Sequence, residues 1–316
     1  MQKVDILCLG TPLMDIFAKA DEKFIKEADL ARGCTNHLKD EEVAKIEQLL
    51  EEGAISQYPG DNARNVCEGF SYLEKTHNSQ GKVCAYAGNI AGDFFGYEIL
   101  RNIAKMGIES YLQIKKGKTG RIACIIDEEK ERTFAVHLGV GEGGMDVGKL
   151  PSCKWFYVTS ITLLAKGEIS KSAYEFMEKC KKEGSKITLS LESENMLKEN
   201  KEKITRFCKM ADVVFLNMDE MGALGLGEKE VGKLANLVFL KKGKNGSCVF
   251  EKGKKLADVA AVPVKKVVDT TGAGDAYCAG ALWALCEGKS DVEAGEEGAK
   301  LAARAVSKIG AGVFEG

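Results

Sequence analysis

The chain has 316 residues, with 45 Lys and Arg against 47 Asp and Glu and a formal net charge of -2. This balance provides no overall field that would attract nucleic acid or an anionic membrane, so we expect neither as a partner. The 11 cysteines include no Cys-x-x-Cys pair, a pattern typical of reduced thiols rather than of a disulfide framework. The amino terminus enters an apolar run at once, and no apolar stretch is long enough to span a bilayer. These features predict a soluble cytoplasmic protein.

The first apolar run ends near a carboxylate. Residues 4–9 (VDILCL) form a short continuous apolar run before Gly10, which is typical of a buried parallel strand. Asp15 follows the carboxyl end of this strand, where open α/β sheets bind ligands. A carboxylate there can accept hydrogen bonds from two neighbouring sugar hydroxyls, although a solvated aspartate in a turn has the same pattern. We predict Asp15 as a substrate-binding residue.

Short strands interrupt the alternation of strands and helices between about residues 16 and 138. A meander of this kind predicts a small β-rich lid, formed by segments of about 16–38 and 108–138. Arg132, at the start of one of these strands, either reaches a pocket or lies solvated on the surface. The predicted elements of this region are strands at 16–20, 34–38, 108–114, 121–126 and 132–138 and a helix at 40–50.

A second glycine turn precedes a helix predicted at 62–73. Gly60 permits a close approach of the backbone. Asn65 projects from the first turn of this helix toward the same pocket as Asp15. Polar residues in a first turn also serve as ordinary caps. Gly60 and Asn65 are therefore candidate binding residues, and an ordinary turn and helix cap is the alternative.

From residue 154 onward, strands and helices alternate again, which predicts an α/β fold with a mostly parallel sheet. The strand at 213–216 leads into Asn217 and Glu220, which share one face of a helix start. They are placed either to hold a water-bound Mg²⁺ beside phosphates or to cap the helix. An Asn-Gly turn predicts a hairpin between 237–241 and 247–250. The other predicted elements are strands at 83–88, 155–159 and 186–191 and helices ending near 106, at 173–182, at 198–210 and at 292–308.

The heptad 269–275 (DTTGAGD) lies between an apolar run at 259–268, predicted as a strand, and a helix predicted at 276–286. Gly272 and Gly274 allow the free N–H groups at the helix start to approach an anion, which the helix dipole attracts. Asp275 in the first turn is placed to take a proton from an attacking hydroxyl. An ordinary capped helix is the alternative.

Two other kinds of motif are set aside. Residues 143–149 and 227–233 both fit the spacing of a Walker loop, but leucine follows each lysine where Ser or Thr would hold Mg²⁺. The three histidines, His37, His77 and His137, have no spacing of metal ligands. We predict neither a Walker loop nor a histidine metal site.

With these segments placed, the sequence resembles the PfkB carbohydrate kinase family over nearly its whole length. The heptad matches the second signature of that family at every position. The resemblance implies a ribokinase-like three-layer α/β/α fold, with residues 1–316 as a single domain, and a kinase that uses ATP and Mg²⁺. It implies an anion hole at Gly272, Ala273 and Gly274 and a catalytic base at Asp275. The implied nucleotide and metal residues are Asn217, Gly243, Gly246 and Thr270 for the nucleotide and Glu220, through water, for the metal.

On the substrate side, the layout is most similar to the adenosine kinase branch of the family. By this resemblance Asp15 binds sugar hydroxyls, and the substrate motif falls on Gly60, Asp61 and Asn65. Asp61 replaces the second glycine of that motif, and either accepts a further hydroxyl hydrogen bond or excludes the usual substrate. Further departures are Lys241, where Thr is common, and Ala299, where Asn is common. We predict Asp15, Gly60, Asp61, Asn65 and Arg132 as the substrate-binding residues.

The sequence leaves three functions open. The first is transfer of the γ-phosphoryl group of ATP to a primary hydroxyl of an adenosine-like nucleoside. The second is a sugar kinase of the ribokinase or fructokinase type, and the third is a non-catalytic ligand-binding relative. In each case the partner is a small nucleoside or sugar, and the chain is either a monomer or a homodimer.

Overall fold

The computed structural model describes residues 3–47, 54–77, 79 and 81–307. Its largest element is a nine-stranded sheet in the order β14-β13-β12-β11-β10-β9-β1-β5-β6. Neighbouring strands are parallel from β12 to β6, and the β12–β13 and β13–β14 pairs are antiparallel. The strands are β1 (Val4–Leu9), β5 (Cys84–Ala91), β6 (Glu109–Lys115), β9 (Cys153–Thr159), β10 (Lys186–Ser190), β11 (Val213–Asn217), β12 (Leu237–Lys241), β13 (Ser247–Glu251) and β14 (Lys254–Val259).

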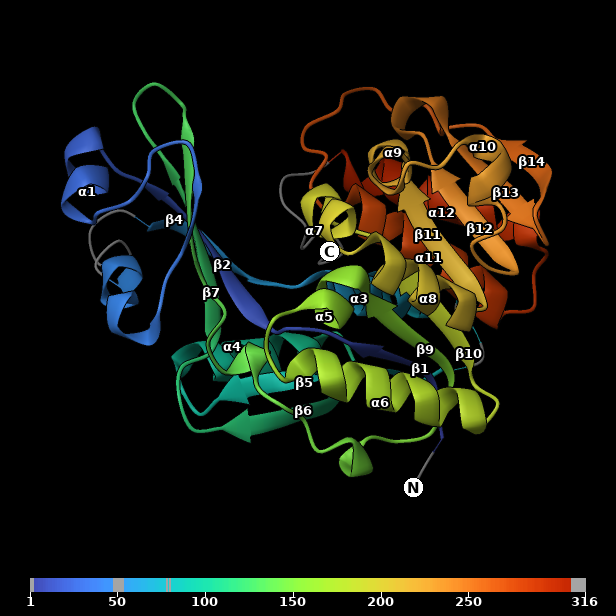
Figure 1. The fold of residues 1–316 in the computed structure, drawn as a ribbon, viewed down its shortest axis with the longest axis horizontal. Helices are drawn as coiled ribbons and strands as arrows, with labels where there is room; N and C mark the ends of the chain where they lie inside the picture. Colours follow the sequence, from blue (N-terminus) through green and yellow to red (C-terminus); the bar gives the residue numbers. More distant parts are fainter. Residues whose placement is uncertain (1–2, 48–53, 78, 80, 308–316) are drawn as a thin grey trace.

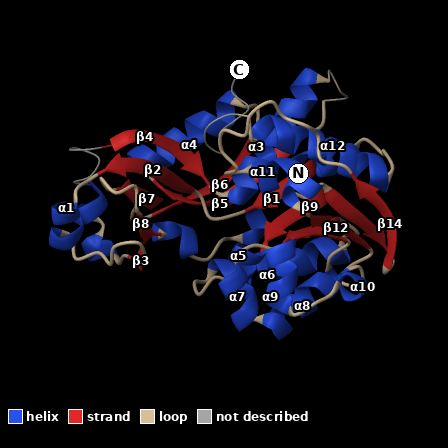
Figure 2. Ribbon diagram, turned by 90° about the horizontal axis from the view of Figure 1, so that it is seen from above, coloured by secondary structure: helices blue, strands red, loops and turns tan. Residues whose placement is uncertain are grey.

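Helices cover both faces of this sheet, as Figure 2 shows from above. The two faces differ by the side-chain alternation along each strand. On β1, Leu7 and Leu9 pack into one core, and Ile6 and Cys8 pack into the other. The three layers confirm the predicted fold. One face carries α3 (Asn62–Thr76), α4 (Phe94–Lys105), α11 (Ala273–Cys286) and α12 (Asp291–Ala305), and the other carries α5 (Ser160–Leu164), α6 (Ile169–Lys182), α7 (Glu194–Glu199), α8 (Lys201–Met210), α9 (Met218–Leu224) and α10 (Glu228–Val231).

A second, five-stranded sheet stands beside the main body and is seen on the left in Figure 1. One of its faces is buried, with Met14 and Ile16 packed against Ile25 of α1 (Glu22–Glu27) and against Ile46. The strand order is β3-β8-β7-β2-β4, with β2 (Leu13–Lys19), β3 (Thr35–His37), β4 (Ala54–Gly60), β7 (Gly120–Ile126) and β8 (Arg132–His137).

The membership of the two sheets differs from the sequence prediction. The strand predicted at 108–114 for the lid is β6, which pairs with β5 at the edge of the large sheet. An edge strand is partly exposed, so its residue pattern does not differ from that of a lid strand. The small sheet instead gains β4, which pairs with β2 and which the sequence did not reveal because most of its residues are exposed.

Three further boundaries are corrected. The strand predicted at 259–268 is wrong: β14 ends at Val259, and the following residues are irregular, since Pro263 lacks a backbone donor and most of the segment is exposed. The helix predicted at 198–210 begins earlier and divides at Asn200 into α7 and α8. In the helix predicted at 40–50, residues 40–42 form a 3₁₀ turn, and the α-helix begins at residue 44. The ends of the helices predicted at 40–50 and 292–308 lie outside the described residues.

Two glycines hold α11 close to α12. A Cβ atom on Gly280 would lie 2.5 Å from the carbonyl oxygen of Glu297, and one on Gly298 would lie 2.8 Å from the carbonyl oxygen of Tyr277. The two helices therefore meet backbone to backbone, which requires glycine at both positions. This contact fixes α11, whose amino terminus carries the heptad. No helix in the described ranges is long and apolar enough to cross a membrane.

Gly280→Ala tests this close approach. The added methyl group overlaps a backbone carbonyl, and we expect the free energy of unfolding to fall by about 1–3 kcal/mol. Gly222→Ala on α9 is the matched control, because its new methyl would meet no described atom within 4 Å beyond its own helix. Urea midpoints of the two variants provide the measurement. A Gly280→Ala midpoint equal to that of the unchanged protein would contradict the backbone contact.

Candidate active site

The heptad forms the start of α11. Gly272 adopts the left-handed conformation, with φ of 73°, which explains the need for glycine there. No side chain among the described residues caps this helix start. The Ala273 N–H donates to the Thr270 carbonyl at 3.2 Å. The N–H groups of Gly272 and Gly274 and the positive end of the helix dipole are available to an anion.

Asp275 lies in the first turn of α11 and is buried. Its Oδ2 atom accepts a hydrogen bond of 2.9 Å from Nδ2 of Asn65, which is buried in the first turn of α3. This bond joins two residues that are 210 positions apart. Burial raises the pKa of Asp275 to about 6, while the Asn65 hydrogen bond and the Lys241 charge oppose the rise. A carboxylate with this pKa is ionised near neutral pH and is still basic enough to accept a proton.

A cluster of charges surrounds this carboxylate. Glu192, directly beyond β10, is buried, and one of its oxygens accepts a 2.6 Å hydrogen bond from Asn62. Its Oε1 atom is buried without a partner. Burial, followed by the charge of Asp275, raises the pKa of Glu192 well above its usual range. Sequence reasoning missed Glu192, although its position after a buried parallel strand was a usable signal.

Asn217 and Glu220 form a complete capping box at the start of α9. The Asn217 side chain accepts from the Glu220 N–H at 2.8 Å, and the Glu220 carboxylate accepts from the Asn217 N–H at 2.6 Å. Asn217 and Glu220 therefore cap the helix, which is one of the two roles that the sequence left open for them. Glu220 is buried, and burial raises its pKa while the Lys241 charge opposes the rise. Its Oε1 atom takes no part in the capping box.

At the end of β4, Gly60 pairs with Leu13 of the neighbouring strand β2. A Cβ atom on Gly60 would lie 2.5 Å from Oδ2 of Asp15, so only glycine leaves room for that carboxylate. Asp15 is half-buried on β2. Burial raises its pKa to about 6; the Arg64 charge opposes the rise and the Asp61 charge adds to it. Asp15 is thus a partly desolvated hydrogen-bond acceptor beside Gly60, which has no side chain to cover it.

Asp61 keeps the backbone shape that a glycine would have. Its φ of 97° is a conformation that favours glycine. The side chain offsets this strain by accepting hydrogen bonds from the N–H groups of Thr11 and Arg64, each at 3.3 Å, and from the Tyr86 hydroxyl at 2.7 Å. Asp61 therefore caps α3 and ties it to the segment after β1 and to β5. A direct contact of Asp61 with the substrate stays a prediction.

Comparison with known proteins identifies the family. A model of the pfkB family carbohydrate kinases matches residues 33–315. The chain belongs to the pfkB carbohydrate kinase family. It is 22% identical to an adenosine kinase of Schizophyllum commune, over 98% of this chain and 97% of that protein. It is 23% identical to a 5-dehydro-2-deoxygluconokinase of Clostridium tetani, over 83% of each chain. The solved structure of adenosine kinase from Sinorhizobium meliloti superposes with a TM-score of 0.80 at 23% identity, covering 98% of this chain and 96% of that one.

This pfkB kinase has a buried arginine that sequence reasoning missed. Arg64 is 1% exposed and donates hydrogen bonds to the Pro59 carbonyl at 2.9 Å, to Asn65 Oδ1 at 2.9 Å and to Glu68 at 2.8 Å. It therefore sets the orientation of the Asn65 amide, whose other end holds Asp275. The Arg64–Glu68 spacing of four residues on a helix was the available signal.

Other predicted residues lie farther from this cluster. Arg132 is exposed and lies opposite Ile126 of β7, whereas Asp15 lies opposite Ile122, four residues earlier on that strand. That separation corresponds to about 13 Å along the sheet. The hairpin of β12 and β13 forms as predicted. In its turn, Gly246 is needed because a Cβ there would lie 2.0 Å from the Val259 carbonyl oxygen, while Gly243 faces open space. Thr270 is exposed in the heptad.

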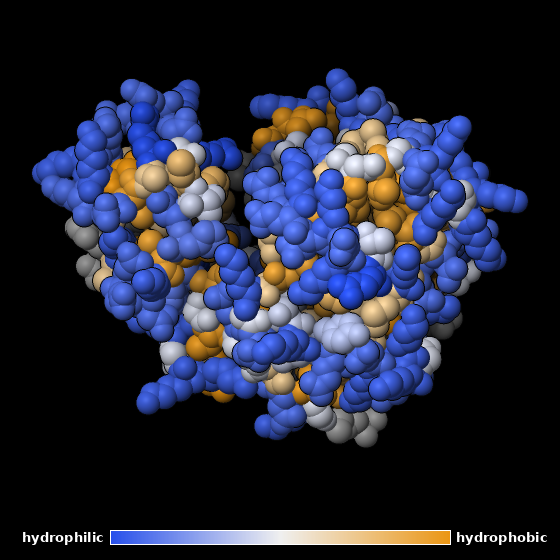
Figure 3. Space-filling view, viewed as in Figure 1, coloured by the Kyte–Doolittle hydropathy of each residue, from blue (hydrophilic) through white to orange (hydrophobic). Residues whose placement is uncertain are grey.

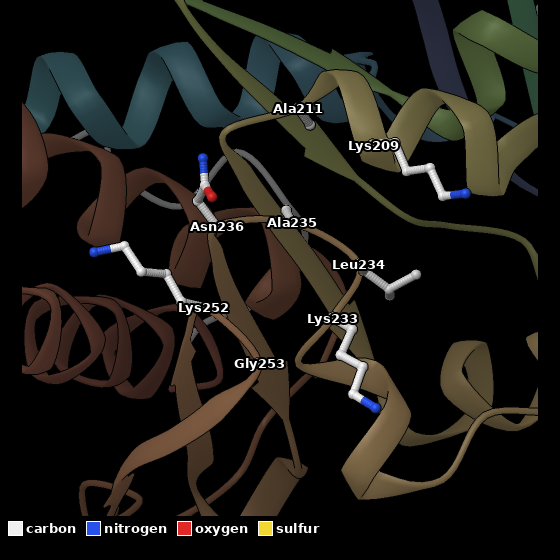
Figure 4. Close-up of a pocket in the computed structure, with 8 residues that line it drawn as sticks. All are labelled: Lys209, Ala211, Lys233, Leu234, Ala235, Asn236, Lys252 and Gly253. Atoms are coloured by element: carbon white, nitrogen blue, oxygen red, sulfur yellow. The ribbon is translucent and has the colours of Figure 1, made fainter.

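Neither a preformed metal cage nor the surface hollow drawn in Figure 4 marks the site. The described residues contain no group of three or more His, Cys, Asp or Glu able to hold a metal ion. A hollow of about 370 Å³ lies elsewhere, around the segment that joins α10 to the amino end of β12. Figure 4 shows that its lysines point apart rather than toward one ligand. The residues lining it are Lys209, Ala211, Lys233, Leu234, Ala235, Asn236, Lys252 and Gly253.

Substitutions at Asp61 test its structural role. Asp61→Asn keeps an acceptor and tolerates a positive φ, so we expect stability within about 1 kcal/mol of the unchanged protein. Asp61→Ala loses the hydrogen bonds and keeps the strain, and should cost about 1–3 kcal/mol. Asp61→Gly, which loses the hydrogen bonds but relieves the strain, should fall between them. Urea unfolding ranks the three variants, and an alanine variant as stable as the asparagine variant would refute this role.

Proposed function

We propose that this chain is a nucleoside kinase, which transfers the γ-phosphoryl group of ATP to the primary hydroxyl of an adenosine-like nucleoside. The observation that carries the proposal is the face of the small sheet around Asp15. Phe17, Ile122 and Phe134 share this face with Asp15, by the alternation along β2, β7 and β8, and they are half-exposed. The buried face of the same sheet is covered by α1.

The apolar face looks across a hollow toward the main body. Figure 1 places α1 on the outer side of the small sheet, and Figure 3 shows the hollow between the two lobes. Half-exposed aromatic and aliphatic side chains favour a flat apolar group such as a nucleobase. The carboxylate of Asp15 in their midst favours neighbouring ribose hydroxyls. A substrate with both features fits better than a simple sugar.

The charges on this side also bear on substrate choice. Asp15 and Asp61 present carboxylates, and the nearby cation Arg64 is buried and fully engaged by protein acceptors. A negatively charged sugar acid would therefore meet repulsion there. A neutral nucleoside would not.

In this proposal each residue has one task. Asp15 accepts hydrogen bonds from the ribose hydroxyls, and Gly60 leaves room for the Asp15 carboxylate. Asn65 holds the Asp275 carboxylate in place, and Asp275 takes the proton of the primary hydroxyl as it attacks. The N–H groups at 272–274 stabilise the charge on the phosphoryl group in transfer. The small sheet acts as a lid that excludes water from the closed site.

The residues present fit the implied nucleotide and metal. The uncapped start of α11 suits phosphate oxygens. The free oxygens of Glu220 and Glu192 lie where carboxylates can hold the water shell of a Mg²⁺, which keeps several waters in such sites. When bound, the ion would neutralise charge on the phosphates. Asn217, Gly243, Gly246 and Thr270 remain our candidates for the nucleotide, and Arg132 for the substrate.

A substrate panel tests the choice of acceptor. With ATP and Mg²⁺ we expect phosphorylation of adenosine and related nucleosides with kcat/KM at least about tenfold above that for ribose or fructose, because the sugars lack the base. ADP release coupled to an optical assay gives the rates, and mass spectrometry gives the product. Higher kcat/KM for a free sugar would favour the sugar kinase alternative and reject the nucleoside assignment.

The acid limb of the pH profile tests the two carboxylates. Both Asp275 and Asp15 have pKa values raised to about 6, so each becomes protonated as the pH falls through about 6. The ionised forms are needed, so log kcat/KM should fall below that pH with a slope approaching two. Asp15→Asn should reduce the slope to one. A slope that is the same in both proteins would argue against ionised Asp15.

Removal of the base itself gives a separate prediction. Asp275→Asn should lower kcat by about 10²–10⁴-fold. Because burial disfavours this carboxylate in the folded protein, its loss should leave the unfolding midpoint at pH 7 unchanged or higher. Rapid-quench assays and urea unfolding supply the two readouts. A variant with near-normal turnover would exclude Asp275 as the base.

A further inference from the structure

We propose that Lys241 is a further catalytic residue, whose ammonium group contacts the phosphoryl group in transfer at the glycine turn. The inference rests on the proposed function, since it deepens the phosphoryl end of the same site. Sequence reasoning noted Lys241 only as a departure from the threonine that is common at this position. The structure provides a reason for the change.

The position of Lys241 follows from the sheet. It is the last residue of β12, at the carboxyl edge, where its register partners are Asn217 on β11 and Ser247 on β13. The side chain runs from there to α11. Its Nζ atom lies 3.3 Å from the point that a Cβ atom on Gly274 would occupy. The ammonium group therefore lies against Gly274, in the turn whose N–H groups form the proposed anion hole.

The ammonium group of Lys241 has no hydrogen-bond or ion-pair partner among the described residues, whereas the adjacent Lys242 pairs with Glu228 at 2.7 Å. Burial works against its charged form, but the surrounding thiol and carboxylates outweigh burial, and the pKa of Lys241 is raised. It is a charged, half-buried lysine with free donors.

This arrangement suits charge that develops during transfer. A phosphoryl group in transfer spreads negative charge over its oxygens, and a fixed cation beside backbone donors stabilises that charge. The lysine also offsets the charge of Glu192 and Glu220, which would otherwise repel the phosphates. A structural counterion would do only the second task. The experiments therefore separate catalysis from charge balance.

Lys241→Met and Lys241→Arg are the test variants, and Lys242→Met is the matched control one residue away. For phosphorylation of adenosine we expect Lys241→Met to lower kcat by about 10²–10³-fold, the usual effect of removing one transition-state donor. The KM for adenosine should stay within about threefold, since the acceptor binds near Asp15. Lys241→Arg should restore at least a tenth of the activity, and Lys242→Met should keep normal turnover.

The pH profile provides a readout that a merely structural role would not move. Because the Lys241 charge lowers the pKa of Asp275, the acid limb of kcat should move to higher pH in Lys241→Met and stay in place in Lys241→Arg. The groups that interact with Asp275 come from several elements. They are Asn65 on α3, Asp61 before α3, Lys241 on β12, Glu220 on α9, Glu192 after β10, Tyr157 on β9 and Cys278 on α11. Of these, only Lys241 is changed in the test.

Nucleotide binding provides a test of Lys241 that does not depend on turnover. By titration calorimetry with Mg²⁺, Lys241→Met should bind the non-hydrolysable ATP analogue AMP-PNP at least about tenfold more weakly and bind ADP equally well, because the contact is to the terminal phosphoryl group. Equal loss for both nucleotides, or no loss for either, would overturn the proposal. So would a Lys241→Met variant that keeps its kcat or that loses stability alone.

The two proposals fail in different ways. A wild-type protein that phosphorylates no member of the substrate panel would reject the proposed function, and the AMP-PNP comparison would still decide the role of Lys241. If Lys241→Met fails to fold, Lys241→Gln and Lys241→Arg carry the same comparison. A glutamine variant with full AMP-PNP affinity would then refute the contact.

Discussion

The hydrogen bond from Asn65 to Asp275 is the contact on which the site depends. It joins, over 2.9 Å, two residues that are 210 positions apart in the sequence. It thereby connects the side of the site formed by Gly60 and Asp15 to the side formed by the glycine turn. Each partner is itself held: Arg64 orients the amide, and the backbone contact of α11 with α12 fixes the carboxylate. Asn65 and the proposed base Asp275 are therefore positioned by helices of the layered fold rather than by loops.

Burial of charge is the cost of this arrangement. Asp275, Glu192 and Glu220 are all buried, and burial raises the pKa of each of them. Lys241 opposes this rise at all three positions. A cluster with several carboxylates and one unpaired cation is poorly balanced for stability but well suited to bind phosphates with a metal ion. Asp61 shows a comparable compromise, since its hydrogen bonds offset a backbone conformation that favours glycine.

Local patterns in the sequence predicted the α/β fold and the candidate site residues that follow buried strands or glycine turns. The three-layer arrangement was implied by the family resemblance. The sequence did not predict β4 or the true place of β6, since exposed edge strands have no distinctive pattern. It also missed Arg64 and Glu192, whose roles arise only when distant segments meet. At Asp61 and Lys241 it detected a departure from the family pattern but not the reason for it. For Asp61 the structure offers the φ angle, and for Lys241 we infer the reason from the distance to Gly274. The proposed choice of a nucleoside as phosphoryl acceptor rests on the half-exposed face around Asp15.

The most direct test of this account is a crystal structure of the Asp275→Asn variant with adenosine, AMP-PNP and Mg²⁺. The account predicts the primary hydroxyl within hydrogen-bonding distance of residue 275, with the ribose hydroxyls on Asp15. It also predicts the terminal phosphoryl group over residues 272–274 and against Nζ of Lys241. A nucleoside bound away from Asp15, or a terminal phosphoryl group remote from the start of α11, would contradict it.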